Sequence, residues 1–187
     1  SYFIDPTIVR EGFNFKPAFY GDEKDSCVIF YTNRTGYSEI VKAPIRQLDF
    51  KDKTETKTII QGEKNKDFEA FHLFTSGLDV SNNGQLVFSV KSSESDKVYI
   101  YDLKQEKIIK ERRWEGIIAA QSPSISADGS KVVFNGITFR GQSDLFLWDV
   151  EQDLLTRLTD DIFLDDQPDI SPDGDWVTFV SDRTEYG

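Results

Sequence analysis

A four-residue turn motif recurs along this sequence at a constant interval, and that interval limits the fold more than any other feature. Ser81-Asn82-Asn83-Gly84, Ser126-Ala127-Asp128-Gly129 and Ser171-Pro172-Asp173-Gly174 start 45 residues apart. In such a motif the Asp or Asn caps its own backbone, and the Gly adopts the positive φ that the turn needs. A short run of alternating apolar residues, typical of a strand, follows each motif. A period in the 40s with strand-type content is the signature of a β-propeller with one four-stranded antiparallel blade per repeat.

The chain is therefore expected to be all-β, a single propeller segment over residues 1–187 with about four blades. The repeats are placed at residues 17–76, 77–116, 117–162 and 163–187, the last one incomplete. Within them we predict strands at 86–91, 98–103, 107–112, 131–135, 144–150 and 154–159. A further strand is expected at 7–10, and a strand with a protruding loop at 49–66. Asp102 and Asp149 are predicted to begin the turns into the fourth strands.

The last repeat stops before its third strand, so the segment is expected to continue into a longer protein. The sequence starts at Ser1 and contains no Met. We therefore expect that an amino-terminal part has been removed.

The charge balance excludes two classes of partner. With 22 Lys and Arg against 33 Asp and Glu, the net charge is −11. Such a surface repels nucleic-acid phosphates and anionic lipid. No apolar run approaches the ~18 residues of a membrane span. The expected partner is another protein or a peptide, whose contacting segment carries basic residues and whose association weakens as salt rises.

The sequence contains no recognisable catalytic apparatus. His72 is the one histidine and lies among apolar neighbours, so we expect it to be a packing residue. It has neither a second histidine for a metal site nor a G-x-S-x-G nucleophile for a triad. Cys27, the one cysteine, cannot form an internal disulfide and is expected to be a small core residue. We predict neither a catalytic residue nor a cofactor.

A cluster of aspartates covers the junction into the last repeat. Its members are Asp160, Asp161, Asp165, Asp166, Asp169, Asp173 and Asp175. Solvated loop charge is the favoured interpretation, with partner recognition and a bound Ca²⁺ as the two alternatives. The residue order of an EF-hand loop is absent.

The repeats resemble a known family. S-x-D-G followed by an apolar strand, then G-x-x-D-L-F-L-W-D and T-R-L-T-D-D, is similar to the TolB-type propeller repeat, and residues 141–183 match best. The match is strong over 117–187, fair over 77–112 and weak over 1–76. Asn82-Asn83 replace the Pro-Asp of the motif. The sialidase Asp-box is a different motif, because here Asp173 and Gly174 are adjacent.

This resemblance implies a six- or seven-bladed propeller, usually periplasmic or otherwise extracytoplasmic in the bacterial envelope. Members of the family bind other proteins or serve as accessory domains beside a peptidase.

Antiparallel blades predict two different faces. The turns between strands one and two and between strands three and four share one face, which we call the turn face. It should hold the structural turn residues Ser81, Gly84, Ser126, Asp128, Gly129, Ser171, Pro172, Asp173 and Gly174, with Gly129 and Gly174 at positive φ. The longer connections 33–38, 92–96, 114–121, 138–143 and 160–167 share the other, the loop face.

Aromatic and Arg residues on loops held by a rigid scaffold are typical of interface hot spots. The predicted partner-binding residues on the loop face are Arg34, Tyr37, Trp114, Phe139, Arg140, Phe163 and Arg183, with Tyr186 beside them.

Three functions from different classes fit the sequence. The leading one is a non-catalytic TolB-like interaction or scaffold module. The second is the accessory propeller of a larger peptidase or hydrolase, which would need a catalytic domain elsewhere. The third is a sugar-binding or sugar-cleaving propeller, which would present Trp148 and Trp176 to solvent as stacking platforms.

Overall fold

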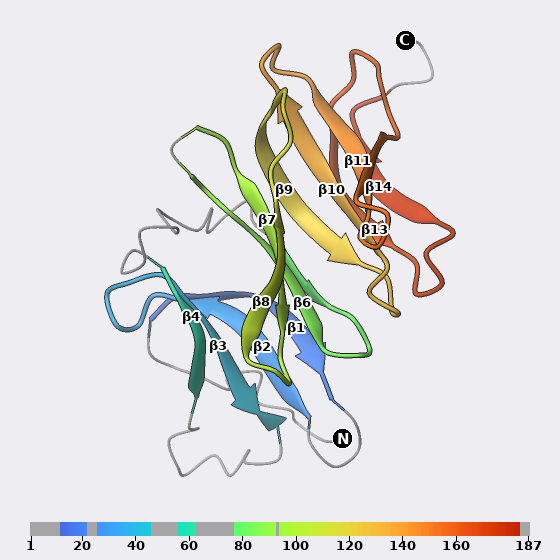
Figure 1. Cartoon of the computed structure of the whole chain (residues 1–187). Helices are drawn as coiled ribbons and strands as arrows, with labels where there is room; N and C mark the ends of the chain where they lie inside the picture. Colours follow the sequence, from blue (N-terminus) through green and yellow to red (C-terminus); the bar gives the residue numbers. More distant parts are fainter. Residues whose placement is uncertain (1–11, 22–25, 46–55, 63–76, 93, 184–187) are drawn as a thin grey trace, which may run out of the picture.

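Antiparallel sheets stacked side by side in sequence order make up the protein (Figure 1). The computed structural model describes residues 12–21, 26–45, 56–62, 77–92 and 94–183. The first sheet contains β1 (Asn14–Tyr20), β2 (Cys27–Thr32), β3 (Glu39–Pro44) and β4 (Lys57–Gln61). The second contains β5 (Leu78–Val80), β6 (Gln85–Val90), β7 (Lys97–Asp102) and β8 (Lys107–Arg112). The third contains β9 (Ile117–Ile125), β10 (Lys131–Thr138), β11 (Ser143–Asp149) and β12 (Leu154–Arg157). The fourth contains β13 (Asp165–Ile170) and β14 (Val177–Ser181).

Each complete sheet pairs its strands in chain order, which is the arrangement of a propeller blade. This confirms the predicted all-β propeller fold, with two strands in the last blade. The predicted fourth strand at 107–112 is confirmed as β8. The predicted strand at 7–10, His72 and most of 49–66 lie outside the described residues. Where the chain is described, no helix is both long and apolar enough to cross a membrane.

The prediction of a strand at 154–159 is wrong at its end, because β12 stops at Arg157. The backbone N–H of Leu145 donates to the Thr159 hydroxyl at 2.9 Å instead of to a backbone carbonyl. A side chain has therefore taken over the ladder position, and regular pairing ends there.

Strand alternation divides the apolar residues between the two neighbours of each blade. On β6, Leu86 and Phe88 pack in the cluster shared with the first blade, whereas Val87 packs in the cluster shared with the third. Successive side chains of a strand point to opposite faces, so a blade whose two faces are covered reads as a continuous apolar run.

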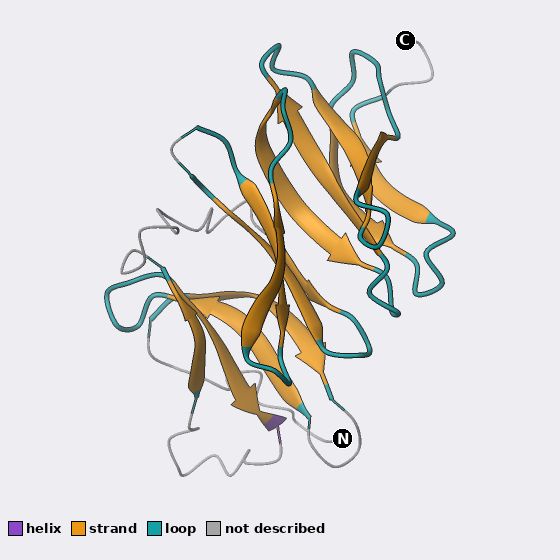
Figure 2. Cartoon of the chain, viewed as in Figure 1, coloured by secondary structure: helices purple, strands orange, loops and turns teal. Residues whose placement is uncertain are grey.

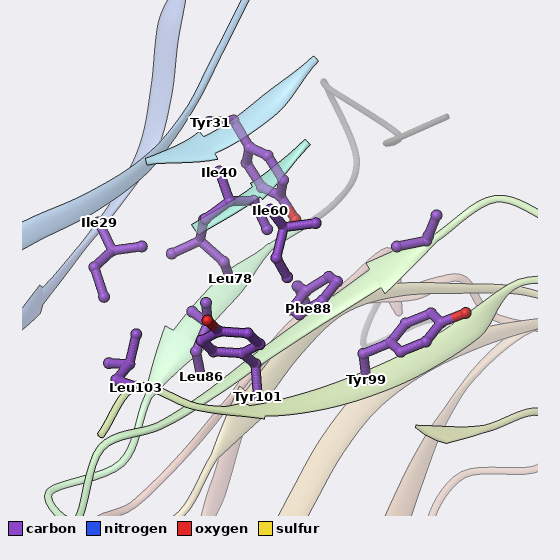
Figure 3. Packing of buried hydrophobic residues seen from close by; sticks show 11 residues of the cluster. Ile29, Tyr31, Ile40, Ile60, Leu78, Leu86, Phe88, Tyr99, Tyr101 and Leu103 are labelled. Atoms are coloured by element: carbon purple, nitrogen blue, oxygen red, sulfur yellow. The ribbon is translucent and has the colours of Figure 1, made fainter. Parts of the chain in front are cut away.

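Two interblade clusters form most of the core. The first joins residues such as Ile29, Tyr31 and Ile40 of blade one to Leu86 and Phe88 of blade two (Figure 3). Half-buried Cys27 packs against it, as expected of a small core residue. The second cluster joins blades two and three and contains Phe134 and the fully buried Trp148.

A bulge interrupts the first strand of three blades at the same place. Lys16, Ser122 and Gln167 adopt positive φ of 53°, 47° and 51°, and each precedes a proline. Strand pairing shifts register at each of these points. Positive φ is uncommon for residues other than glycine, and the sequence pattern alone did not predict these bulges.

Candidate partner-binding face

The connections between strands divide between two faces, as antiparallel pairing requires. The turn face carries the S-x-D-G turns and the turns that follow β7 and β11. The loop face carries the connections after β2, β6 and β10 and, among the described connections between blades, those from β8 to β9 and from β12 to β13. Figure 2 shows these connections in teal at the ends of the strands.

The S-x-D-G turns are closed by their own side chains. In the third blade the Ser126 hydroxyl donates to Asp128 Oδ1 at 2.7 Å, and the Ser130 backbone N–H donates to the same oxygen. These hydrogen bonds lower the pKa of Asp128 to about 2, the Ser126 bond having the largest effect. Gly129 and Gly174 have φ of 78° and 74°, which confirms their predicted conformation.

The turns into the fourth strands also form as predicted. Asp102 Oδ1 accepts the N–H groups of Lys104 and Gln105, both at 2.8 Å. Asp149 Oδ1 accepts the Gln152 N–H at 2.8 Å. Both are Asx-type turns that lead into β8 and β12.

Successive turns are also hydrogen-bonded to one another. The Asn82 N–H donates to the Ala127 carbonyl at 2.9 Å, and the Ala127 N–H donates to the Pro172 carbonyl at 3.1 Å. The donors are the residues that occupy the proline position of the motif, and proline has no N–H to give. The departures from the family motif at Asn82 and Ala127 therefore add two interblade bonds on the turn face.

A second set of interblade bonds links the first strands of the blades. Asp79 Oδ2 accepts the Ser124 hydroxyl and the Ile125 N–H, both at 2.9 Å. Ser124 Oγ accepts the Ile170 N–H at 3.3 Å and lies 3.0 Å from Asp169 Oδ1. Asp79, Ser124 and Asp169 are 45 residues apart. The sequence period is therefore also the period of the contacts between blades.

Three of the predicted partner-binding residues are engaged within the protein. Trp114 is half-buried and stacks on Phe134 with ring centroids 5.0 Å apart. The Arg183 guanidinium lies 5.7 Å from the centroid of the Phe163 ring and pairs with Asp161 and Asp165 at 2.6 Å and 2.9 Å.

The other four predicted residues differ in how far their side chains are exposed to solvent. Tyr37, Phe139 and Arg140 are exposed, whereas Arg34 is half-buried. Phe139 and Arg140 lie together between β10 and β11. Arg34 and Tyr37 lie in the first blade, between β2 and β3, so the predicted residues do not form one cluster. Tyr186 lies outside the described residues.

Two exposed residues of the loop face were missed by the sequence reasoning. Ile162 and Leu164, between β12 and β13, are 87% and 53% exposed. Their apolar character in a segment rich in aspartate is the signal in the sequence, but aliphatic side chains are less typical of binding hot spots than aromatic and Arg side chains.

The acidic cluster of this segment is largely bound to protein partners. Asp161 accepts the Phe163 N–H, and this bond, followed by the Arg183 guanidinium, lowers the pKa of Asp161. Asp165 pairs with Arg183, and Asp160 pairs with Arg157. Within the described ranges no three or more His, Cys, Asp and Glu side chains are grouped so that they could hold a metal ion.

The two tryptophans named as possible stacking platforms differ. Trp148 is fully buried, and its indole N–H donates to Asp153 Oδ1 at 3.1 Å. Trp176 is 76% exposed. It occupies the position of Lys131 in the third blade, whose ammonium reaches the next blade at the Gly174 carbonyl. Of the two rings expected to face solvent on a sugar-binding surface, the structure buries Trp148 and exposes Trp176.

Four successive sheets with chain-order pairing, a repeated turn motif and interblade clusters define a β-propeller segment. No protein-family model matches the chain. Comparison with solved structures shows the TolB-like propeller fold. TolB from Acinetobacter baumannii superposes with a TM-score of 0.71 at 16% identity, over 96% of this chain and 40% of that one.

TolB from Agrobacterium tumefaciens superposes with a TM-score of 0.60 at 19% identity, over 85% of this chain and 51% of that one. The chain thus spans two fifths to one half of these TolB structures. Prolyl oligopeptidase B from Galerina marginata superposes with a TM-score of 0.55 at 17% identity, over 93% of this chain and 24% of that one.

Proposed function

We propose that this chain is a protein-interaction module without catalysis of its own, and that it binds another protein or a peptide through its loop face. We further propose an extracytoplasmic location in the bacterial envelope, since the sequence motif resembles the TolB-type repeat. The likeness of fold to the two TolB structures supports the class of module.

The observation that carries the choice of face is the contrast between the two ends of the blades. On the turn face, the S-x-D-G turns are occupied by small polar residues whose donors and acceptors are used within and between these turns. The loop face presents Tyr37, Phe139 and Arg140 on connections anchored by strands at both ends. Aromatic and Arg side chains are enriched among binding hot spots, and a backbone already fixed by strands needs no further ordering on binding.

A second candidate is the accessory propeller of a larger peptidase. The likeness of fold to prolyl oligopeptidase B favours this candidate, because the matched part is only 24% of that larger protein. In that case the propeller would position or admit substrate for a catalytic domain elsewhere in the protein. Hydrolysis of peptide substrates by the full-length protein separates this candidate from the first.

The test of the first candidate compares matched double variants of the full-length protein in partner capture. Phe139→Ala with Arg140→Ala changes the loop face, and Leu154→Ala with Lys104→Ala changes exposed residues near the turn face. We expect the first pair to abolish capture and the second to leave it unchanged, with both variants folded. Loss of capture by the second pair alone would reject the loop face.

A further inference from the structure

Two loops of the loop face, residues 138–142 and 158–164, lie beside each other at the tops of blades three and four (Figure 1). Gln142 Nε2 donates to the Asp161 carbonyl at 3.3 Å, and the Ser143 hydroxyl donates to the Asp165 carbonyl at 2.8 Å. The second bond is buried. The two loops therefore form one continuous surface.

This surface exposes four large apolar side chains, of which Leu158, at 42%, is the least exposed. Phe139 is 77% exposed, and Ile162 and Leu164 are exposed as given above. We call these three residues the apolar patch. Apolar side chains gathered on a surface and surrounded by polar groups mark interaction sites in proteins.

The patch is held in place by the segment beneath it. The Leu158 N–H donates to the Leu145 carbonyl at 2.8 Å, and the Leu164 N–H donates to Asp182 Oδ1 at 2.8 Å. Arg157 pairs with the buried Asp144 at 2.5 Å. Because the loop is fixed by these bonds, Ile162 and Leu164 are presented without further ordering, which favours binding.

The surroundings of the patch are acidic. Residues 157–166 contain four aspartates and one arginine. That arginine, Arg157, is paired with Asp144 and Asp160, and Arg183 is paired with Asp161 and Asp165. Asp160 and Asp182 are exposed carboxylates at the edge of the patch. Arg140, which follows Phe139, is an exposed cation of the same surface. Counted with Arg157 and Arg183, it gives three arginines against the five aspartates Asp160, Asp161, Asp165, Asp166 and Asp182, so the local charge is negative, as is the net charge of −11.

We propose that the apolar patch and its acidic surroundings bind a segment of a partner protein in which apolar side chains alternate with lysine or arginine. The apolar side chains cover Phe139, Ile162 and Leu164, and the cations meet Asp160 and Asp182. An anionic membrane or a nucleic acid is repelled by the same charge. The inference rests on the proposed function, because it names the chemistry of the partner at the loop face.

The probes are three fluorescent twelve-residue peptides, and their binding to the purified full-length protein is measured by anisotropy. One alternates leucine and lysine, the second has serine for leucine, and the third has glutamate for lysine. We expect the leucine–lysine peptide to bind at least tenfold more tightly than either of the others. Its affinity falls as NaCl rises from about 0.05 M to about 0.5 M, because surface charges are then screened.

Matched variants locate the binding. Ile162→Ser and Phe139→Ser should each lower the affinity for the leucine–lysine peptide by about tenfold or more. This is the effect of losing one apolar side chain that becomes well buried in the complex. Leu154→Ser and Trp176→Ser remove exposed apolar side chains elsewhere and should change affinity by less than about twofold. All four sites are exposed, so melting should be close to that of the parent.

Two results would overturn the inference. One is equal binding of the lysine and glutamate peptides. The other is an Ile162→Ser effect no larger than that of Leu154→Ser. If either occurs while partner capture still depends on Phe139 and Arg140, the partner chemistry is wrong and the proposed function stands. If capture is also independent of these residues, the proposed function fails as well.

Discussion

Gly174 holds a backbone conformation that most residues avoid, with φ of 74°. A Cβ at this position would lie 3.1 Å from the flexible end of Lys131, so crowding is mild and backbone strain dominates. Gly174→Val should lower the free energy of unfolding by about 1–3 kcal/mol. Gly174→Asn should retain most of the free energy of unfolding, because asparagine tolerates this backbone conformation. Equal urea midpoints for the two variants would contradict the turn assignment.

Asp128 provides a pH-dependent test at the same scale. Its pKa is lowered from 3.8 to about 2 in the folded protein. The stabilisation is therefore fully present above about pH 4 and is lost as the pH falls through 2. We expect Asp128→Asn to be about 1 kcal/mol less stable than the parent at pH 6. That difference should shrink between pH 4 and pH 2, and a difference independent of pH would contradict the hydrogen-bonded carboxylate.

At the scale of elements, the connection from β8 to β9 is anchored by a tryptophan. Trp114 stacks on Phe134 and meets the edge of Trp148, with centroids 5.0 Å and 5.4 Å apart. Trp114→Ala should lower the free energy of unfolding by about 2–3 kcal/mol. This is less than the loss of a fully buried tryptophan would cost, because Trp114 is half-buried. Phe139→Ala is the matched aromatic control and should cost less than about 0.5 kcal/mol. Thermal melts that rank the two the other way would place Trp114 in solvent.

The contact between blades two and three has its own test. Asp79 accepts the Ser124 hydroxyl across the interface at 2.9 Å. In a double-mutant cycle, Asp79→Ala and Ser124→Ala should couple by about 1 kcal/mol. Strictly additive losses would mean that these two strands do not meet.

The strands and the turn motif could be predicted because both depend on residues that are close together in the sequence. The motif Ser126-Ala127-Asp128-Gly129 contains all the groups that close its own turn. The bulges at Ser122 and Gln167 could not be predicted, since a residue before proline usually favours extended backbone. The partners of the loop residues were also unpredictable from sequence. Arg183 meets Asp161 and Asp165 only because β14 returns beside β13.

At the scale of the whole molecule, the fold consists of blades that dock in sequence order with a contact period of 45 residues. The Asn82 and Ala127 N–H groups report this directly, because their acceptors, Ala127 and Pro172, belong to the next blade. In an isolated blade these turn amides would face solvent.

Residue-resolved hydrogen exchange is the most direct measurement of that docking. We predict that the Asn82 and Ala127 amides exchange about 100-fold or more slowly than the Arg140 amide, which lies in an exposed loop. Exchange of Asn82 and Ala127 at the rate of Arg140, in a protein whose strand amides remain protected, would contradict the stacked propeller.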